Sequence, residues 1–182
     1  MLISKNTVNL SAIDDYIKCK GYKLPDDFNQ FLRKYNGGNT PNTTLKTSSV
    51  STDVRLFYGV GNDMPNSLNK VQVMDKKGSI YLPIAEDSFG NVFVLDITQN
   101  TGVYFVDHEK NRKLEFVTES FDSFVKLCKS EPIKESSKKT PKEREALLIR
   151  KGKASNITED LRKLWQEEYN KYNGMTQEEV VL

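Results

Sequence analysis

Residues 24–38 read Leu24-Pro-Asp-Asp-Phe-Asn-Gln-Phe-Leu-Arg-Lys-Tyr-Asn-Gly-Gly38, a stretch that predicts an amphipathic helix with a defined start and a defined end. Its apolar side chains recur at i, i+3, i+4 and i+7, and they are Phe28, Phe31, Leu32 and Tyr35. Pro25 suits the first turn of a helix, and the pair Gly37-Gly38 supplies the left-handed residue that ends one. We expect the apolar side of this helix to pack beneath a sheet.

The polar stretch that follows, residues 38–52, is expected to be a surface loop. Beyond it the apolar period changes from 3.6 to 2, which predicts strands at 55–60, 79–85, 91–97, 102–107 and 113–117. Glycine-containing turns at 87–90 and 99–102 join neighbouring strands, so an antiparallel meander is expected. Pro83 lacks an N–H group and predicts an edge strand or a bulge.

Two more helices complete the expected domain. One runs from about Ala12 to Lys20 behind Ser11 as its N-cap. The other follows Ser120, and its apolar side chains are Phe121, Phe124, Val125 and Cys128. The order helix, helix, strands, helix predicts an α+β fold over residues 1–129, in which an antiparallel or mixed sheet carries helices on one face.

The composition changes after Lys129. Residues 130–142 carry many charges, two prolines and no aromatic residue, so we expect a linker. Residues 143–182 are expected to form a helical C-terminal extension, with an apolar stripe of Ile157, Leu161, Leu164, Trp165 and Tyr172. An amphipathic helix is unstable alone in water, so this stripe is expected to bury against the core domain or against a second subunit, in a homodimer.

Charge and hydropathy narrow the class of protein. The 182 residues include 27 Lys and Arg, 25 Asp and Glu, and 37% hydrophobic residues, which suffices for an ordinary core. No run of roughly 20 apolar residues exists, so no membrane partner is expected. Cys19 and Cys128 lack metal or redox spacing and are expected to be reduced core side chains. We therefore expect a cytoplasmic protein.

Motifs of catalysis are sparse. His108 is the single histidine, and no nucleophile motif accompanies it, which favours a polar loop residue over a catalytic or metal-binding one. Gly59-Val-Gly61 lacks the third glycine of a dinucleotide fingerprint. Residues 138–153 are rich in Lys and Arg without interleaved aromatic residues, which favours a solvated or partner-docking segment over contact with nucleic acid.

An acidic segment is the more informative charge pattern. Between Tyr81 and Glu109 there is no Lys or Arg, and the acids are Glu86, Asp87, Asp96, Asp107 and Glu109. Because antiparallel strand ends lie close together, we expect these acids to form a negative surface, with Asn91 as a polar group among them. That surface would bind a basic partner. The alternative is that the acids only protect the sheet and keep it solvated.

Several segments together resemble the SUKH superfamily (the Smi/Knr-like family). They are the residue 24–38 stretch, Phe57-Tyr-Gly-Val-Gly61, Leu82-Pro-Ile-Ala-Glu-Asp-Ser-Phe-Gly-Asn-Val-Phe-Val-Leu-Asp96, Val103-Tyr-Phe-Val-Asp-His-Glu109 and Ser120-Phe-Asp-Ser-Phe-Val125. They occur in the family's order and cover about residues 11–129.

The resemblance implies an α+β fold, no cofactor and no catalytic residue. Bacterial members look like immunity proteins that bind and neutralise a cognate polymorphic toxin, often a nuclease, whereas fungal relatives regulate the cell wall and signalling. We therefore expect a non-enzymatic immunity protein with a basic toxin as partner. The alternative is an intracellular regulatory module with a partner that is not a toxin.

Overall fold

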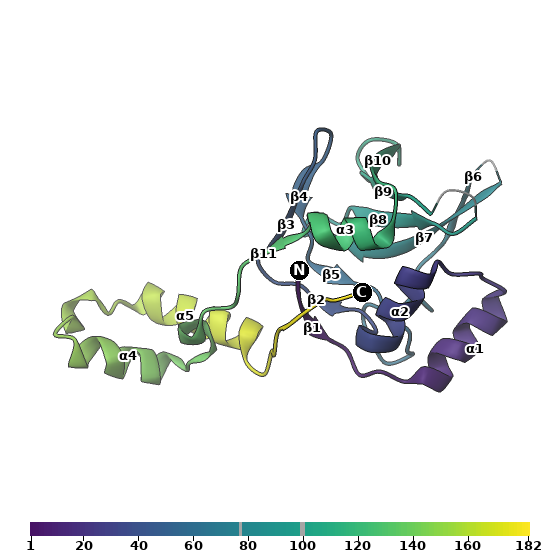
Figure 1. Ribbon diagram of the computed structural model, residues 1–182. Helices are drawn as coiled ribbons and strands as arrows, with labels where there is room; N and C mark the ends of the chain where they lie inside the picture. Colours follow the sequence, from purple (N-terminus) through teal and green to yellow (C-terminus); the bar gives the residue numbers. More distant parts are fainter. Residues whose placement is uncertain (77, 99–100) are drawn as a thin grey trace. The chain divides into compact units, whose positions relative to one another are not determined.

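The computed structural model describes residues 1–76, 78–98 and 101–182. The contacts among these residues divide the chain into two compact units. Unit 1 comprises Met1–Glu131 and Gln177–Leu182, and unit 2 comprises Pro132–Thr176. The α+β prediction is confirmed, because helices pack against antiparallel strands in unit 1 and further helices come later in the sequence (Figure 1).

The helices of unit 1 are α1 (Leu10–Lys20), α2 (Asp26–Tyr35) and α3 (Phe121–Leu127). Its strands are β1 (Leu2–Lys5), β2 (Gly38–Asn39), β3 (Thr43–Lys46), β4 (Ser51–Asp53), β5 (Leu56–Phe57), β6 (Met74–Lys76), β7 (Ser79–Glu86), β8 (Val92–Asp96), β9 (Val103–Val106), β10 (Leu114–Thr118), β11 (Lys129–Ser130) and β12 (Glu178–Glu179). Residues 99 and 100 of the predicted 99–102 turn lie outside the described residues.

The main sheet has the strand order β10-β9-β8-β7-β5-β2-β1-β12. Strand β6 pairs with the N-terminal part of β7, where Met74 is the partner of Tyr81. Its named strand pairs are all antiparallel, as in β7 with β8 and β8 with β9. The register between β7 and β8 shifts between Pro83 and Ala85. This irregularity confirms the bulge alternative, because a residue without an N–H cannot complete the regular ladder.

A cluster of phenylalanine rings forms the centre of unit 1. Phe31 is fully buried and its ring centroid lies 5.3 Å from that of Phe57 and 5.0 Å from that of Phe121. Phe124 of α3 contacts Phe93 of β8 at 4.9 Å. The predicted packing of the α2 side chains under the sheet, together with α3, is therefore confirmed.

Asn36, Gly38 and Gly59 determine the backbone path at the C-terminal end of α2. Asn36 ends α2 in the left-handed conformation, with φ at 51°. Its amide donates to the carbonyl oxygens of Thr7 at 2.8 Å and Val60 at 3.0 Å. A Cβ atom on Gly59 would lie 1.9 Å from the Asn36 carbonyl oxygen, and one on Gly38 would lie 2.2 Å from the Ser4 carbonyl oxygen. Only glycine allows the backbones to approach this closely.

Three local predictions were wrong. The 38–52 stretch is not only a loop, because Thr43 and Leu45 alternate with exposed neighbours and pair as β3 with β4. Helix α1 begins at Leu10, since the side chain of Asn9 accepts from the Ala12 N–H and caps it. Cys19 is exposed on α1 and is not a core side chain, whereas Cys128 is buried as expected.

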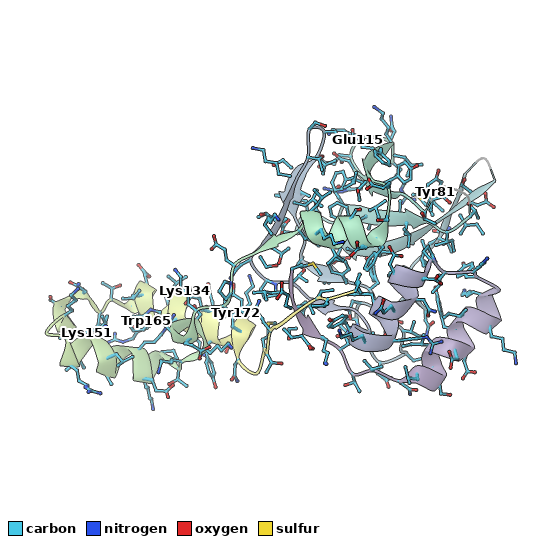
Figure 2. All side chains as sticks on the ribbon, in the orientation of Figure 1. Tyr81, Glu115, Lys134, Lys151, Trp165 and Tyr172 are labelled. Carbon is cyan, nitrogen blue, oxygen red and sulfur yellow. The ribbon has the colours of Figure 1, made fainter. Side chains whose placement is uncertain are left out.

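Unit 2 contains η1 (Glu135–Lys138), α4 (Pro141–Arg150), η2 (Ala154–Asn156) and α5 (Glu159–Tyr172). The predicted linker thus holds a 3-10 turn and the start of α4, where Thr140 and Glu143 form a capping box. Arg144 bonds Glu168 at 2.6 Å, and its guanidinium lies 5.5 Å from the ring of Trp165, which Figure 2 labels. Trp165 is buried, whereas Leu164 is half exposed, so the expected stripe is covered only in part.

Candidate functional site

The main sheet has two faces of different character. Phe93 contacts Phe105 and Phe124, so it points toward α3. Successive residues of a strand point to opposite faces, so Val92 and Val94 point away from that helix. Their partners across the strand pair, Val106 and Tyr104, lie on the same side. We call this side the open face.

A hollow of about 230 Å³ lies on the open face. It is lined by Tyr58, Val71, Gln72, Met74, Pro83, Gly90, Val92, Val94, Val106, His108 and Arg112, and we call it the sheet hollow. Four of its side chains, from β7, β8 and β9, are purely aliphatic: Pro83, Val92, Val94 and Val106. The sheet therefore has apolar side chains on the face where an antiparallel sheet with one solvated face usually carries polar residues.

An aromatic row continues the open face toward the sheet edge. Tyr81 of β7, labelled in Figure 2, stands edge-on to Tyr104 of β9, with ring centroids 5.5 Å apart. Tyr104 stands edge-on to Phe116 of β10 at 5.6 Å. Phe116 is 55% exposed. Since Tyr104 pairs with Val94 across β8 and β9, the aromatic row adjoins the sheet hollow.

Glu86, Asp107 and Glu109 lie at one end of the open face, near the turn between β7 and β8. Glu86 pairs with Arg55 and accepts from the Tyr58 hydroxyl at 2.6 Å. Asp107 accepts from the Glu109 N–H at 2.9 Å and pairs with Lys110 at 3.2 Å, and these contacts hold its pKa below the ordinary value. Glu109 is exposed.

Asp87 and Asn91 lie beside these acids but are buried, with 1% and 9% exposure. Asp87 accepts from the Asn91 N–H at 2.8 Å, the Asn91 side-chain amide at 2.9 Å and the Thr52 hydroxyl at 2.9 Å. The Asn91 oxygen in turn accepts from the His108 N–H at 3.1 Å and lies 2.8 Å from Nδ1 of His108. These two residues hold the turn together and orient His108 at the rim of the sheet hollow.

Asp96 lies at the other end of β8. It pairs with Tyr81, whereas Glu86 pairs with Val92 at the opposite end of the same strand pair. Asp96 is 1% exposed and accepts from the N–H and the hydroxyl of Thr98 at 2.9 and 2.6 Å. The structure thus brings Glu86, Asp87, Asn91, Asp107 and Glu109 together, leaves Asp96 apart, and buries two of the acids.

The apolar open face was missed from the sequence. Its signal is present, because Val92-Phe-Val-Leu95 and Val103-Tyr-Phe-Val106 are apolar at consecutive positions rather than at alternate ones. Such runs are typical of strands with apolar side chains on both faces.

The described residues contain neither a side-chain cluster suited to a metal ion nor a helix suited to a membrane span. Within residues 1–76, 78–98 and 101–182, no group of three or more His, Cys, Asp or Glu side chains could hold a metal ion. No helix in that part of the chain has both the length and the apolar character that a membrane span requires.

Known proteins resemble this chain mainly over the core of unit 1. The family model described as SMI1-KNR4 cell-wall (SUKH_6) matches residues 17–125, which include α2, the meander and most of α3. The SPbeta prophage-derived uncharacterized protein YokK of Bacillus subtilis (strain 168) is 30% identical over 138 residues, which cover 62% of this chain and 70% of that protein. No solved structure matches the chain. On these residues and this fold, the chain belongs to the SMI1-KNR4 family of the SUKH superfamily.

Proposed function

We propose that this chain is a non-enzymatic immunity protein, which neutralises a protein toxin by direct binding through the open face. The open face carries the proposal, because the exposed Phe116 and the partly exposed rings of Tyr81 and Tyr104 lie next to the sheet hollow, where Val92 is partly exposed. Contiguous exposed apolar surface is typical of sites that bind other proteins. Aromatic residues are also enriched in the energetic centres of such interfaces.

The charges at the rim favour a basic partner. Glu109 is exposed, and Glu86 and Asp107 carry partly neutralised charge beside it. Nuclease toxins are commonly basic because their substrate is a polyanion, so an acidic rim would speed their encounter with the chain. Binding over the substrate site of such a toxin would block it without chemistry on either protein.

The family supports a binding role. Bacterial members of the superfamily look like immunity proteins, and the relative YokK is described as prophage-derived. The alternative is a regulatory protein that uses the same kind of surface to bind a partner that is not a toxin. The two functions are distinguished by whether the chain protects cells against a toxin.

The test expresses the products of the genes adjacent to this one in a bacterial host and identifies those that arrest growth. Each such toxic product is then expressed with and without the full chain. We expect the chain to restore growth, and the purified pair to form a one-to-one complex. Phe116→Ser should weaken that complex at least tenfold, which corresponds to about 1.4 kcal/mol. Leu10→Ser is the matched control, because Leu10 of α1 is 51% exposed and lies neither at the sheet hollow nor in the turn between β7 and β8.

Circular dichroism and the melting temperature must first show that both variants are folded. Protection by the chain at equimolar ratio, lost in the Phe116 variant and kept in the Leu10 variant, supports the proposal. Absence of protection against every toxic domain encoded in the same neighbourhood would contradict it. Protection at far less than one chain per toxin would also contradict it, because a stoichiometric inhibitor cannot turn over.

A further inference from the structure

We propose that the sheet hollow receives one aromatic side chain of the partner, an indole or a phenol, whose N–H or O–H donates to Nε2 of His108. This inference rests on the proposed function, since it takes the partner to be a protein. It adds the chemistry of the anchor residue and the group that recognises it.

The size of the hollow selects one large side chain. Its volume is about 230 Å³, and an apolar cavity of about 150 Å³ holds a benzene molecule. One fused or substituted ring therefore fits, whereas two side chains do not. Val92 is the partly exposed member of the aliphatic lining, and Pro83, Val94 and Val106 beside it are buried. The floor that such a ring would meet is therefore apolar.

The neighbours of His108 fix its orientation and its tautomer. The Asn91 amide nitrogen faces the Asp87 carboxylate at 2.9 Å, and two nitrogens of His108 face the Asn91 oxygen. The reverse amide orientation would set oxygen against carboxylate and N–H against N–H, so the assignment is determined by the network. Nδ1 must then carry the hydrogen, and neutral His108 keeps Nε2 as an acceptor.

Nε2 is the polar group left for a ligand. Among the described residues no hydrogen bond to Nε2 is found, and the His108 side chain lines the sheet hollow. A ring that buries its body in the hollow would leave its N–H or O–H in need of a partner, which this acceptor provides.

The charge of Arg112 disfavours a Lys or Arg anchor in the hollow. Arg112 also lines the sheet hollow, so a Lys or Arg side chain entering it would meet a like charge. A ring is instead attracted to a guanidinium through its π face. The basic residues of the partner are therefore expected around the anchor, opposite Glu109, and not inside the hollow.

The test uses 3-methylindole as the probe, and 1,3-dimethylindole as a matched probe that lacks the N–H group. Both are titrated at millimolar concentration into the isotope-labelled full chain and followed by amide and methyl NMR. We expect 3-methylindole to shift Val92, Val94 and Val106 and to bind about threefold to tenfold more tightly than the dimethyl compound. His108→Phe should remove that difference, and His108→Gln, which keeps an acceptor, should restore part of it.

Val92→Phe tests the hollow itself, because Val92 is partly exposed there and a larger side chain fills the space. It should abolish binding of 3-methylindole and weaken protection, whereas Leu10→Ser, which changes an exposed side chain of α1, should leave both unchanged. Shifts confined to other parts of the chain, or equal affinity for both probes, would overturn the inference. Normal protection by a folded Val92 variant would overturn it while leaving the immunity proposal intact. Ring binding without any protection would instead contradict the immunity proposal alone.

Discussion

The side chain of Asn36 bonds both backbone groups of Val60: its oxygen accepts from the Val60 N–H at 2.7 Å, and its amide donates to the Val60 carbonyl at 3.0 Å. This pair of bonds ties the end of α2 to the segment that follows β5. Asn36 is 1% exposed, so each of these polar groups would be buried without a partner if the amide were lost. The Asn-Gly-Gly sequence is thus a structural junction.

Asn36→Asp should lower the free energy of unfolding by about 2–4 kcal/mol, because a carboxylate cannot donate to the Thr7 and Val60 carbonyls that the amide serves. Urea denaturation measures the change. The matched control is Asn111→Asp, since Asn111 is also left-handed, with φ at 52°, but is exposed. A loss below about 0.5 kcal/mol for Asn36→Asp would show that the junction does not stabilise the fold.

Phe31→Ala should cost about 3–5 kcal/mol, because it opens a cavity between rings that the fold holds rigidly. Phe31 is fully buried and its centroid lies within 5.5 Å of those of Tyr35, Phe57 and Phe121. Thermal and urea unfolding should agree on this value. The exposed Phe89→Ala serves as the control and should change stability by under about 0.5 kcal/mol. If the two variants were equally stable, the aromatic cluster would not be the core.

Helix α2 was predictable because its signals are local and agree with one another. The residue after Pro25 begins it and its apolar side is continuous. Its left-handed end lies at Asn36, one residue before the Gly37-Gly38 pair that was expected to supply it. Strands β1 and β12 were missed for the opposite reason. Leu2 pairs with Glu179 from the other end of the chain, and the four residues of β1 and the two of β12 are too few to show a clear period.

The candidate site was predicted in part. The register of the meander does bring Glu86, Asp107 and Glu109 to one end, as the turn positions indicated. The burial of Asp87 could not be predicted from its charge. An aspartate at a turn can accept hydrogen bonds from the backbone N–H groups two and four residues later, and these bonds compensate for burial. Asp87 does this with Phe89 and Asn91 and is drawn into the structure.

Two acids of the predicted surface should therefore respond differently to substitution. Asp87→Asn should destabilise the chain by about 2–4 kcal/mol, since an amide cannot accept all the bonds that the buried carboxylate accepts. Glu109→Lys should leave stability within about 0.5 kcal/mol and slow association with a basic partner at low salt. Stopped-flow association at several salt concentrations measures the second effect. An unchanged rate and salt dependence would mean that Glu109 is a solvated residue without a role in encounter.

Stability should fall in alkaline solution because of buried thiol and phenol groups. Burial raises the pKa of the Cys128 thiol to about 12, and burial also raises the pKa of Tyr16 and Tyr58. In the unfolded chain the thiol ionises near about pH 8.5. The folded chain then holds a proton that the unfolded chain releases, so the free energy of unfolding decreases as the pH rises above that value.

Urea denaturation between about pH 7 and pH 10.5 tests this dependence. Cys128→Ala should reduce the slope, and in the native chain a thiol reagent should modify the exposed Cys19 and spare Cys128. A flat profile across this range, or equal reactivity of both thiols, would contradict the assigned burial.

Unit 2 is an insertion in the sequence between two segments of unit 1, Met1–Glu131 and Gln177–Leu182. Ser130 and Glu179, at the two ends of the insertion, both contact Leu2: the Ser130 hydroxyl accepts from its N–H at 2.9 Å, and Glu179 is its strand partner. Neighbouring strands lie about 4.8 Å apart, so a linker of about four to six residues can join Glu131 to Gln177. Unit 1 lacking residues 132–176 should therefore fold.

The matched variant ends at Glu131 and also lacks the C-terminal strand. It should be less stable, because it loses the buried Val180, the β1–β12 pairing and the bond between the Val181 N–H and the Tyr35 hydroxyl. We expect a difference of about 2–4 kcal/mol between the two deletions, measured by urea denaturation. Equal stability would show that β12 adds nothing to unit 1. If the linked variant failed to fold while the full chain folds, unit 2 would be required for the fold of unit 1, and the insertion would not be separable.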